Sequence, residues 1–398
     1  MDQRLQNMRI ALTHDYWVRV RGGERVFLAL TRMFPQADLY VLAQRRAALV
    51  SFPADRQPRA SFLRRIPFSG RFYRELLPLY PLAARSLDLR GYDLVISSSS
   101  GFCHAAPTDG LSVCYCHTPL RYAWQEYDAT LASQRFPPAR AALATVLDRV
   151  RRADYAAAQR VGAYIANSRT TQARVKQFYG RESVVVYPFI DTTRFSPAAG
   201  APPSAPAPAS GGYYMLLSAL LPYKRVDLAV MACQRLGRRL MIVGEGPERA
   251  RLERLAGPDT HFLPHVDDAT LARLYAGCDA FLQCGREDFG IASLEAQACG
   301  RPVIAFGEGG ALETVAPGVS GLYFHEQNLD AVIEALQTFD PRAWDSRAIR
   351  AHAERFDEAH FADRMRQALG EAVARGAGVA QSEAQGESQG IRRQEGRA

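Results

Sequence analysis

Short apolar runs of four to eight residues recur along the chain, and most are followed by a turn residue and then by apolar positions with helical spacing. Runs of this length bounded by Gly, Pro or Ser predict buried strands, and the segments between them predict helices. The predicted strands occupy residues 8–13, 92–98, 112–117, 163–168, 183–188, 213–218, 239–246, 261–266, 280–284, 302–306 and 321–325. Strands that alternate with helices over short connections predict parallel sheets covered by helices, which is the α/β class.

One stretch departs from this pattern. Residues 197–212 read PAAGAPPSAPAPASGG, a composition that predicts an exposed and poorly ordered segment. A chain of 398 residues is also too long for one core. We predict two doubly wound domains, an N-terminal one over 1–190 and a second over 213–345, joined by a linker over 191–212. A helical segment over 346–375 is expected to pack back on the first domain. We expect the polar tail over 376–398 to be disordered.

Two carboxylates lie eight positions apart in the stretch 283–315, which reads QCGREDFGIASLEAQACGRPVIAFGEGGALETV. Glu287 follows a predicted strand, and Glu295 falls inside a helix that we expect to begin near Gly290. Backbone N–H groups at such a helix start, near Gly290 and Ile291, favour a phosphate group. The alternative is an ordinary strand and helix that carry two solvated glutamates.

Three other places carry candidate chemistry. Gly22 and Gly23 separate a strand from a helix and could seat a phosphate, or could simply let the loop turn. His117 ends a predicted strand, at the edge where open α/β sheets bind ligands, although a lone histidine is often structural and His104 is a rival. Lys224 and Arg225 stand at a helix entry, where paired cations suit a diphosphate or form an ordinary surface pair.

Composition narrows the class of protein. The chain is 47% hydrophobic and 23% charged, which is typical of a globular protein, and no run of about eighteen apolar residues predicts a membrane span. Its polar start, MDQRLQNMRI, is unlike a secretory signal. Seven cysteines without a C-x-x-C pair predict reduced core residues of a cytoplasmic protein. Gly244-Glu245-Gly246 resembles a dinucleotide motif, but Arg249 replaces its third glycine, which argues against an NAD site.

Positive charge is concentrated in the first half. Residues 1–190 carry 27 Lys and Arg against 14 Asp and Glu, a net charge of +13, whereas residues 191–398 carry 22 against 27, a net charge of −5. The segment 56–90 interleaves arginines with aromatic residues, which favours an anionic membrane surface. The alternative is a solvated basic face whose aromatics turn into the core. No nucleic-acid-binding module is recognisable, so we expect no nucleic acid partner.

The motif around Glu287 and Glu295, with the FGIASLE core, Arg301-Pro302-Val303 and Gly309-Gly310 before Glu313, resembles the donor-site signature of glycosyltransferase family 4. Members of that family are retaining enzymes of the GT-B fold, in which two Rossmann-like domains face each other across a cleft. The resemblance spans residues 8–375 and is strongest over 213–315. The CHTPLRY segment around His117 resembles bacterial O-antigen and exopolysaccharide mannosyltransferases.

The resemblance implies a role for each candidate residue. Glu295 would bind the ribose and Glu287 the transferred sugar. Lys224, helped by Arg225, would stabilise the leaving diphosphate. Backbone N–H groups would also bind the diphosphate, and they belong to Gly22, Gly23, Gly290 and Ile291. His117 would contact the sugar. Relatives commonly carry an arginine shortly before the lysine, but this chain reads Ser218-Ala219-Leu220 there, which leaves Arg225 as the candidate second cation.

The predicted function is a retaining glycosyltransferase of cell-surface glycan biosynthesis, such as that of lipopolysaccharide. It would transfer a hexose to a lipid-linked or polysaccharide acceptor, and the first candidate is mannose from GDP-mannose. The chain has no Asp-x-Asp pair, so we expect no metal cofactor, and we expect a cytoplasmic protein peripheral to the inner face of the plasma membrane. The alternatives are a catalytically silent sugar-nucleotide-binding subunit, a sugar-nucleotide epimerase and a glycan phosphorylase.

Overall fold

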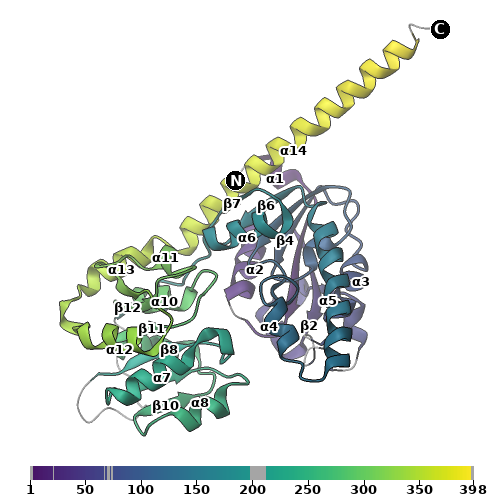
Figure 1. Ribbon diagram of the computed structural model, residues 1–398. Coiled ribbons are helices and arrows are strands. Elements are labelled where there is room, and N and C mark those ends of the chain that lie inside the picture. Colours follow the sequence, from purple (N-terminus) through teal and green to yellow (C-terminus); the bar gives the residue numbers. More distant parts are fainter. Residues whose placement is uncertain are drawn as a thin grey trace. The chain divides into compact units, whose positions relative to one another are not determined.

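The computed structural model describes residues 3–20, 22–66, 68–69, 72, 75–197 and 212–395. The chain forms two compact units (Figure 1). The first comprises Met1–Val186 with Ala362–Ala398, and the second comprises Tyr187–Phe361. Each unit is a parallel sheet with helices on both faces, so the predicted α/β class and its two doubly wound halves are confirmed.

The first unit contains a seven-stranded sheet in the order β3-β2-β1-β4-β5-β6-β7. Its strands are β1 Ile10–Trp17, β2 Asp38–Gln44, β3 Arg59–Ala60, β4 Leu94–Ser99, β5 Leu111–Cys116, β6 Ala163–Ala166 and β7 Ser183–Val185. Every neighbouring pair is parallel. The order reverses between β1 and β4, and open α/β sheets bind ligands at such a switch point.

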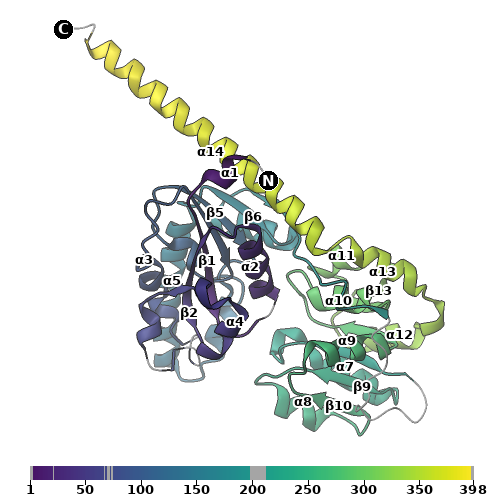
Figure 2. The same cartoon turned by 180° about the vertical axis from the view of Figure 1, so that it is seen from behind.

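Helices of the first unit cover both faces of its sheet. α2 lies on one face, and α3 and α5 lie on the other (Figure 2). The helices are α1 Gln3–Asn7, α2 Gly22–Met33, α3 Tyr80–Arg85, α4 Tyr127–Ala132, α5 Pro137–Ala158 and α6 Arg169–Tyr179. Ser168 caps α6, because its Oγ accepts a hydrogen bond of 3.0 Å from the N–H of Thr171.

The second unit contains a six-stranded parallel sheet in the order β10-β9-β8-β11-β12-β13, so its switch point lies between β8 and β11. Its strands are β8 Tyr214–Leu217, β9 Leu240–Val243, β10 Thr260–Leu263, β11 Ala280–Gln283, β12 Val303–Phe306 and β13 Gly321–Phe324. Its helices are α7 Val226–Arg235, α8 Arg249–Leu255, α9 Asp268–Gly277, α10 Ile291–Ala298, α11 Ala311–Thr314, α12 Leu329–Thr338 and α13 Ser346–Glu354.

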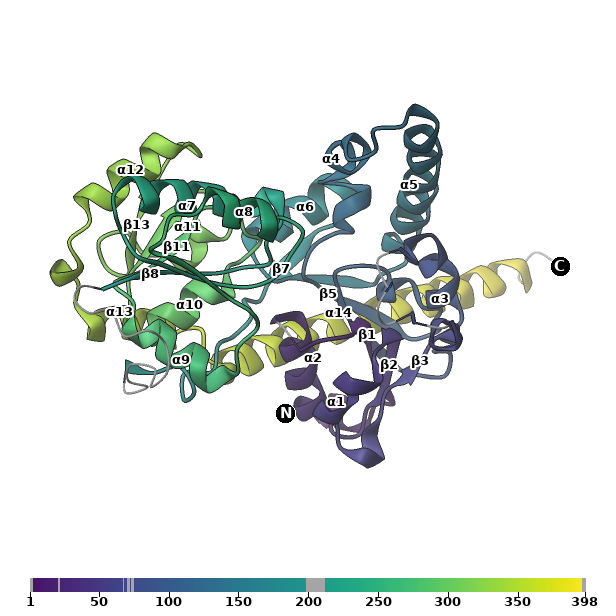
Figure 3. The same cartoon turned by 90° about the horizontal axis from the view of Figure 1, so that it is seen from below.

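Alternate strand residues of this sheet enter two different cores. Phe281 and Val303 pack with residues of α9 and α10, whereas Leu282 and Ile304 pack with residues of α7 and α12. This alternation follows from the pleat of a strand, which sends successive side chains to opposite faces. Figure 3 shows the two helical layers on either side of the sheet. Strands buried on both faces explain the continuous apolar runs of the sequence.

The structure corrects the predicted boundaries between the segments. Ile190 ends the predicted first domain and Phe195 lies in the predicted linker, but both are buried in a core of the second unit, which begins at Tyr187. The remainder of the predicted linker, 198–211, lies outside the described residues. The apolar side chains near residue 190 therefore pack into the second unit. The Pro- and Ala-rich sequence begins only after them.

The C-terminal segment also differs from the prediction. It forms two helices, because α13 ends at Glu354 and α14 spans Glu358–Glu395. Ala362 and the following residues group with the first unit, and Met365 and Leu369 are buried. The backbone remains helical beyond Gly376, where the polar, Gly-containing sequence predicted disorder.

Candidate functional site

Lys224 and Glu287 form an ion pair at the switch point of the second unit. Lys224 ends a short 3-10 turn, Pro222–Lys224, that follows β8, and Glu287 lies on the loop after β11. The two strands are neighbours, so residues 63 positions apart meet at the carboxyl edge of one sheet. The structure thus brings together the predicted leaving-group residue and the predicted sugar residue.

The pair is partly buried, with side-chain exposures of 13% for Lys224 and 26% for Glu287. Burial alone would lower the pKa of Lys224, but the adjacent Glu287 carboxylate, with smaller help from Tyr223, outweighs burial and raises that pKa. The lysine is therefore a fixed positive charge at neutral pH, held by one carboxylate in a poorly hydrated position. Such a charge is suited to a diphosphate that gains charge during bond cleavage.

Glycines let three loops approach one another around this pair. A Cβ on Gly285 would lie 2.7 Å from the Cα of Lys224, and a Cβ on Gly310 would lie 2.2 Å from the backbone oxygen of Phe289. Gly290 caps α10 with φ 99°, a conformation that glycine adopts without strain. The N–H of Gly310 donates to the backbone oxygen of Glu287 at 2.9 Å. These contacts fix the Glu287 loop and leave Gly290 and Ile291 at the helix start.

Arg225 lies next to Lys224 in an unusual backbone conformation. Its φ of 48° and ψ of 39° are left-handed, which costs a residue with a side chain roughly 1 kcal/mol or more. Its guanidinium donates to Asp227 Oδ1 at 3.2 Å and to the backbone oxygen of Gln327 at 3.3 Å. The side chain is one-third exposed, so it stands at the site's edge with one carboxylate partner.

Glu295 occupies a different environment from Glu287. It lies inside α10, as predicted, but only 4% of it is exposed, and its Oε2 accepts a hydrogen bond of 3.1 Å from Tyr275 on α9. The two glutamates are therefore not equivalent surface carboxylates. A ribose-binding role for Glu295 stays a prediction.

At the switch point of the first unit, Ser98 joins two histidines. His14 lies in β1, and its Nδ1 is 2.9 Å from the backbone oxygen and 3.1 Å from the Oγ of Ser98 in β4. Ser98 Oγ is also 2.8 Å from Nε2 of His117, which directly follows β5. A Cβ on Gly23 would lie 3.5 Å from the same Nε2, so Gly23, near the start of α2, borders the predicted sugar-binding histidine.

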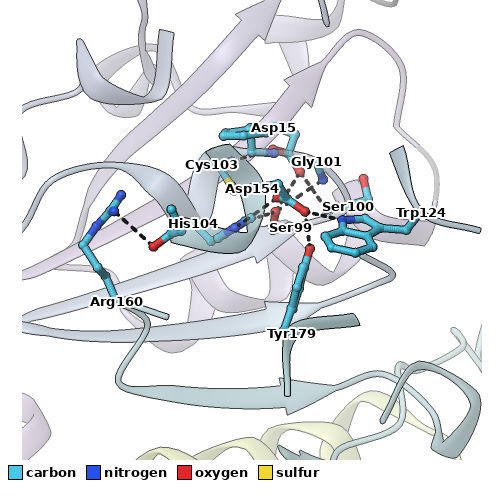
Figure 4. A network of polar contacts seen from close by, with 12 residues as sticks. Asp15, Ser99, Ser100, Gly101, Cys103, His104, Trp124, Asp154, Arg160 and Tyr179 are labelled. Atoms are coloured by element: carbon cyan, nitrogen blue, oxygen red, sulfur yellow. Dashed lines mark hydrogen bonds and ion pairs between the residues drawn. The ribbon is translucent and has the colours of Figure 1, made fainter. Parts of the chain in front are cut away.

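A second polar network lies behind this edge (Figure 4). Asp15 accepts backbone hydrogen bonds of 2.6 to 2.7 Å from Ser100, Phe102 and Cys103, which fix the loop after β4. Burial raises the pKa of Asp15, although these donors oppose the shift. His104, the rival to His117 in the sequence, is buried in this network and faces Asp154 on α5. It therefore stabilises the fold beneath the edge instead of lining it.

The sequence pattern did not single out His14 or Ser98 as site residues. It placed the strand at 8–13, but β1 continues to Trp17 because β2 and β4 pair with it on both sides. Register places His14 directly opposite Ser98, a pairing across 84 positions that no local pattern reveals. The available signal was the run Ser97 to Ser100, small polar residues at the end of an apolar strand.

In the Arg-rich segment 56–90, some residues support the fold, and others are exposed as a membrane-binding surface would require. Arg56 donates to the backbone oxygens of Thr31, Phe34 and Ala37 at the end of α2, and Tyr80 is buried, so these residues support the fold. Exposed residues of the same segment include Arg64, Arg65, Phe68, Phe72, Leu82 and Arg85, with Phe68 75% exposed, and also the acidic Glu75 and Asp88. Arg71, Tyr73 and Arg74 lie outside the described residues.

Three further observations bear on the class of site. All seven cysteines are buried and unpaired, as predicted. Among the described residues, no cluster of three or more His, Cys, Asp or Glu side chains is arranged to hold a metal ion. Within the same part of the chain, no helix combines the length and apolarity needed to cross a membrane.

Solved structures identify the fold class. The chain superimposes on HepE of Anabaena in complex with UDP, with a TM-score of 0.65 and 20% identity over 92% of this chain and 100% of HepE. It also superimposes on sucrose-phosphate synthase of Thermosynechococcus elongatus, with a TM-score of 0.67, 20% identity and the same coverage. These likenesses, together with the two parallel sheets, show that the fold is GT-B.

The family follows from the sequence matches. Residues 20–194 match the family described as Glycosyltransferase Family 4, and residues 205–340 match the family described as Glycosyl transferases group 1. The chain belongs to the family 4 glycosyltransferases of the GT-B fold, as the resemblance implied.

Two curated relatives are partial matches. A GDP-mannose-dependent alpha-(1-6)-phosphatidylinositol monomannoside mannosyltransferase of Mycolicibacterium smegmatis is 33% identical over 204 residues, 44% of this chain and 52% of the relative. A D-inositol 3-phosphate glycosyltransferase of Mycolicibacterium gilvum is 30% identical over 207 residues, 48% of this chain and 47% of the relative. The chain therefore spans about half the length of the curated relatives that it matches.

Proposed function

We propose that this chain is a retaining glycosyltransferase that transfers a hexose from a nucleotide sugar to a lipid-linked or polysaccharide acceptor. The observation that carries the proposal is the contact between Lys224 and Glu287. In a nucleotide sugar, one C–O–P linkage joins the sugar to the diphosphate. A cation for the diphosphate and a carboxylate for the sugar hydroxyls must therefore be neighbours, and this pair meets that requirement.

The chemistry assigned to each residue follows from its charge and position. The ammonium of Lys224 would neutralise the diphosphate as the bond to the anomeric carbon breaks, with Arg225 as a second cation at the edge. Glu287 would accept hydrogen bonds from sugar hydroxyls, and the N–H groups at the start of α10 would bind phosphate oxygens. On the first unit, Gly22, Gly23 and His117 would contact the diphosphate and sugar.

We propose GDP-mannose as the first donor to test, because a partial relative is named as GDP-mannose-dependent. The fold neighbour HepE was crystallised with UDP and with UDP-glucose, so uridine nucleotides form the necessary comparison set. No metal enters the proposed chemistry, since Lys224 and Arg225 supply the positive charge. Activity that persists in EDTA would support this part of the proposal.

We further propose that the acceptor is carried by the inner face of the plasma membrane in glycan synthesis, such as that of lipopolysaccharide. The support is the exposed set around Phe68 and Phe72, which adds apolar rings to the cations of Arg64 and Arg65. Aromatic rings with arginines suit the headgroup layer of an anionic bilayer.

The experiment incubates the protein with radiolabelled GDP-mannose, UDP-glucose or UDP-N-acetylglucosamine and a bacterial membrane lipid extract. Transfer of label to the lipid fraction, with the donor's anomeric configuration retained, supports the proposal. Binding without transfer favours a silent subunit, and conversion of one nucleotide sugar into another favours an epimerase. Formation of a sugar 1-phosphate from glycan and inorganic phosphate, without any use of the nucleotide sugar, favours a phosphorylase. Lys224→Met serves as the matched inactive control.

A further inference from the structure

Gln283 is the last residue of β11 and carries the one polar side chain of that strand, which reads AFLQ and is buried throughout. Only 6% of Gln283 is exposed. Because side chains alternate along a strand, Gln283 lies on the same face of the sheet as Phe281, which packs with residues of α9 and α10. A carboxamide therefore lies between the carboxyl edge of this sheet and the helices that cover it.

The amide of Gln283 has a buried donor without an acceptor. Nε2 is shielded from solvent, and it has no hydrogen-bond partner among the described residues. A primary amide nitrogen carries two hydrogens that can be donated. An unpaired buried donor destabilises the folded state, and nearly all buried polar groups in proteins are paired. An apolar side chain would stabilise this position better, so the amide points to a role other than folding.

The amide faces the start of α10. A Cβ on Gly290, the residue that caps this helix, would lie 3.0 Å from Oε1 and 3.6 Å from Nε2 of Gln283. A half-turn of the amide exchanges its two ends, so either position can present an N–H group. The first backbone N–H groups of α10 have no acceptor inside the helix. The side-chain donor of Gln283 and the backbone donors of the helix start are therefore neighbours.

Nearby hydroxyl groups are already hydrogen-bonded to other atoms. Ser293 Oγ lies 3.3 Å from the same Cβ position, but its hydroxyl donates to the backbone oxygen of Gly290 at 2.6 Å and lies 3.2 Å from Thr314 Oγ1. The Thr314 hydroxyl donates to the backbone oxygen of Gly310 at 3.0 Å. Nε2 of Gln283 takes no part in these bonds. An anion bound at the helix start would supply the acceptor that this cluster does not.

We propose that Gln283 binds the nucleotide sugar by donating an amide hydrogen to an oxygen of the diphosphate at the start of α10. This inference rests on the proposed function, because the nucleotide sugar supplies the diphosphate. The amide is neutral, so it contributes a directed hydrogen bond, while Lys224 supplies the charge. A neutral donor that holds the diphosphate before and during bond cleavage affects substrate affinity more than turnover.

The test replaces Gln283 with Met, which has a similar length and no N–H group. Calorimetry measures binding of GDP, UDP, GDP-mannose and UDP-glucose to wild type and variant. We expect Gln283→Met to bind the preferred nucleoside diphosphate and its sugar ester more weakly by the same factor, about tenfold. The melting temperature of the unliganded variant should equal or exceed that of wild type, because no internal hydrogen bond of Nε2 is lost. Gln283→Leu should behave in the same way.

Gln297→Met is the matched control. Gln297 lies on α10 and is fully buried, but both ends of its amide are paired. Its Nε2 donates to the backbone oxygen of Thr314 at 2.8 Å, and its Oε1 is 2.8 Å from Nδ1 of His352. The same substitution breaks both contacts there, so we expect a lower melting temperature and unchanged affinity for the nucleoside diphosphate. The two variants should therefore show opposite patterns.

Three results would overturn the inference while leaving the proposed function intact. Equal affinity of wild type and Gln283→Met would show that the amide does not contact the nucleotide. A lower melting temperature of Gln283→Met, or its failure to fold, would show a structural role such as holding a buried water. A loss confined to the sugar nucleotides would place the amide on the sugar and not on the diphosphate. If wild type binds none of the four compounds, the proposed function itself fails and this inference fails with it.

Discussion

His104 and Asp154 face each other inside the first unit, with 3.4 Å between His104 Nε2 and Asp154 Oδ1 (Figure 4). The other carboxylate oxygen accepts hydrogen bonds of 2.7 Å from Trp124 Nε1 and 2.8 Å from the Tyr179 hydroxyl. Burial raises the pKa of Asp154 to about 7 and lowers the pKa of His104 to about 4. At mildly acidic pH the proton of this contact therefore rests on Asp154.

This arrangement predicts a specific pH dependence of stability. An unfolded aspartate titrates near ~4, so between about pH 4 and 7 the folded state binds the proton at Asp154 more tightly than the unfolded state does. The contribution of Asp154 to the free energy of unfolding is therefore greatest at low pH and is lost as pH rises through the folded pKa. Lowered histidine pKa values act in the opposite direction below about pH 6.5, so wild-type data alone do not isolate Asp154.

Asp154→Asn removes this titration and keeps an acceptor for Trp124 and Tyr179. We expect the unfolding free energy of wild type minus that of Asp154→Asn to fall between pH 5 and 8, by at most ~1.4 kcal/mol per pH unit. Urea unfolding at each pH gives the difference. Asp148→Asn is the control, because Asp148 lies on the same helix but is exposed and accepts from Tyr127. A difference that does not change with pH would contradict the raised pKa.

The ion pair of the second unit predicts a loss of turnover without a loss of fold. Lys224→Met keeps the length of the side chain and removes its charge, so turnover should fall roughly a hundredfold or more. Glu287→Gln should weaken nucleotide-sugar binding, measured by calorimetry. The double variant should be more stable than the two single changes predict when added, because neither partner is left unpaired, with a coupling of ~0.5–3 kcal/mol. Additive stability changes would show that the pair is not coupled in solution.

Arg225 allows charge and backbone strain to be separated. Arg225→Ala removes the charge but keeps a side chain at φ 48°, whereas Arg225→Gly removes both the charge and the strain. If the guanidinium helps bind the diphosphate, both variants should bind the donor about tenfold more weakly. Arg225→Gly should be roughly 1 kcal/mol more stable than Arg225→Ala. Wild-type donor affinity in both variants would remove Arg225 from the diphosphate site.

The exposed set on the first unit predicts membrane binding that depends on charge. Replacing Arg64 and Arg65 with Gln should weaken binding to vesicles containing anionic phosphatidylglycerol, by ~1 kcal/mol per residue, and added salt should reduce the wild-type binding similarly. The control replaces Arg235 and Arg254, which are exposed on the second unit. Vesicle sedimentation that gives equal binding for both double variants would argue against this surface.

Elements with dense apolar runs could be predicted from the sequence, and elements with exposed faces could not. The strand expected at 302–306 is β12, because all its residues are buried and a buried strand imposes a continuous apolar run. By contrast, α5 has a largely exposed first half, rich in Ala, so no apolar stripe marks it. Periodicity reports burial, and a helix that buries little of its surface leaves a weak pattern.

For the candidate site too, some features could be predicted from the sequence and others could not. Local features such as Gly290 before a helix, or Lys224 after a strand, could be predicted because one turn of chain contains all the required information. The pairing of Lys224 with Glu287, and the bridge from His14 to His117, depend on strand order and register across distant segments. Burial of Glu295 against Tyr275 depends on how α9 packs on α10. Such contacts are properties of the fold and not of any local motif.

Gly310 provides the sharpest test of how the Glu287 loop is held. Its φ of −63° suits any residue, so only space should forbid a side chain there. A Cβ would lie 2.2 to 2.4 Å from backbone atoms of Phe289, and backbone atoms cannot move aside as the end of a flexible side chain can. Gly310→Ala should therefore displace the loop, weaken nucleotide-sugar binding and lower the melting temperature.

Gly318→Ala is the matched control for this change. Gly318 has φ +76° and nothing within 4 Å of an added Cβ, so alanine there should cost roughly 1–2 kcal/mol through backbone strain alone. We expect Gly318→Ala to lower the melting temperature while leaving donor affinity unchanged. Thermal unfolding with and without the nucleotide sugar measures both quantities. If Gly310→Ala also kept wild-type affinity, the loop would tolerate displacement, and the close packing of Gly310 on Phe289 would not be what holds Glu287 in place.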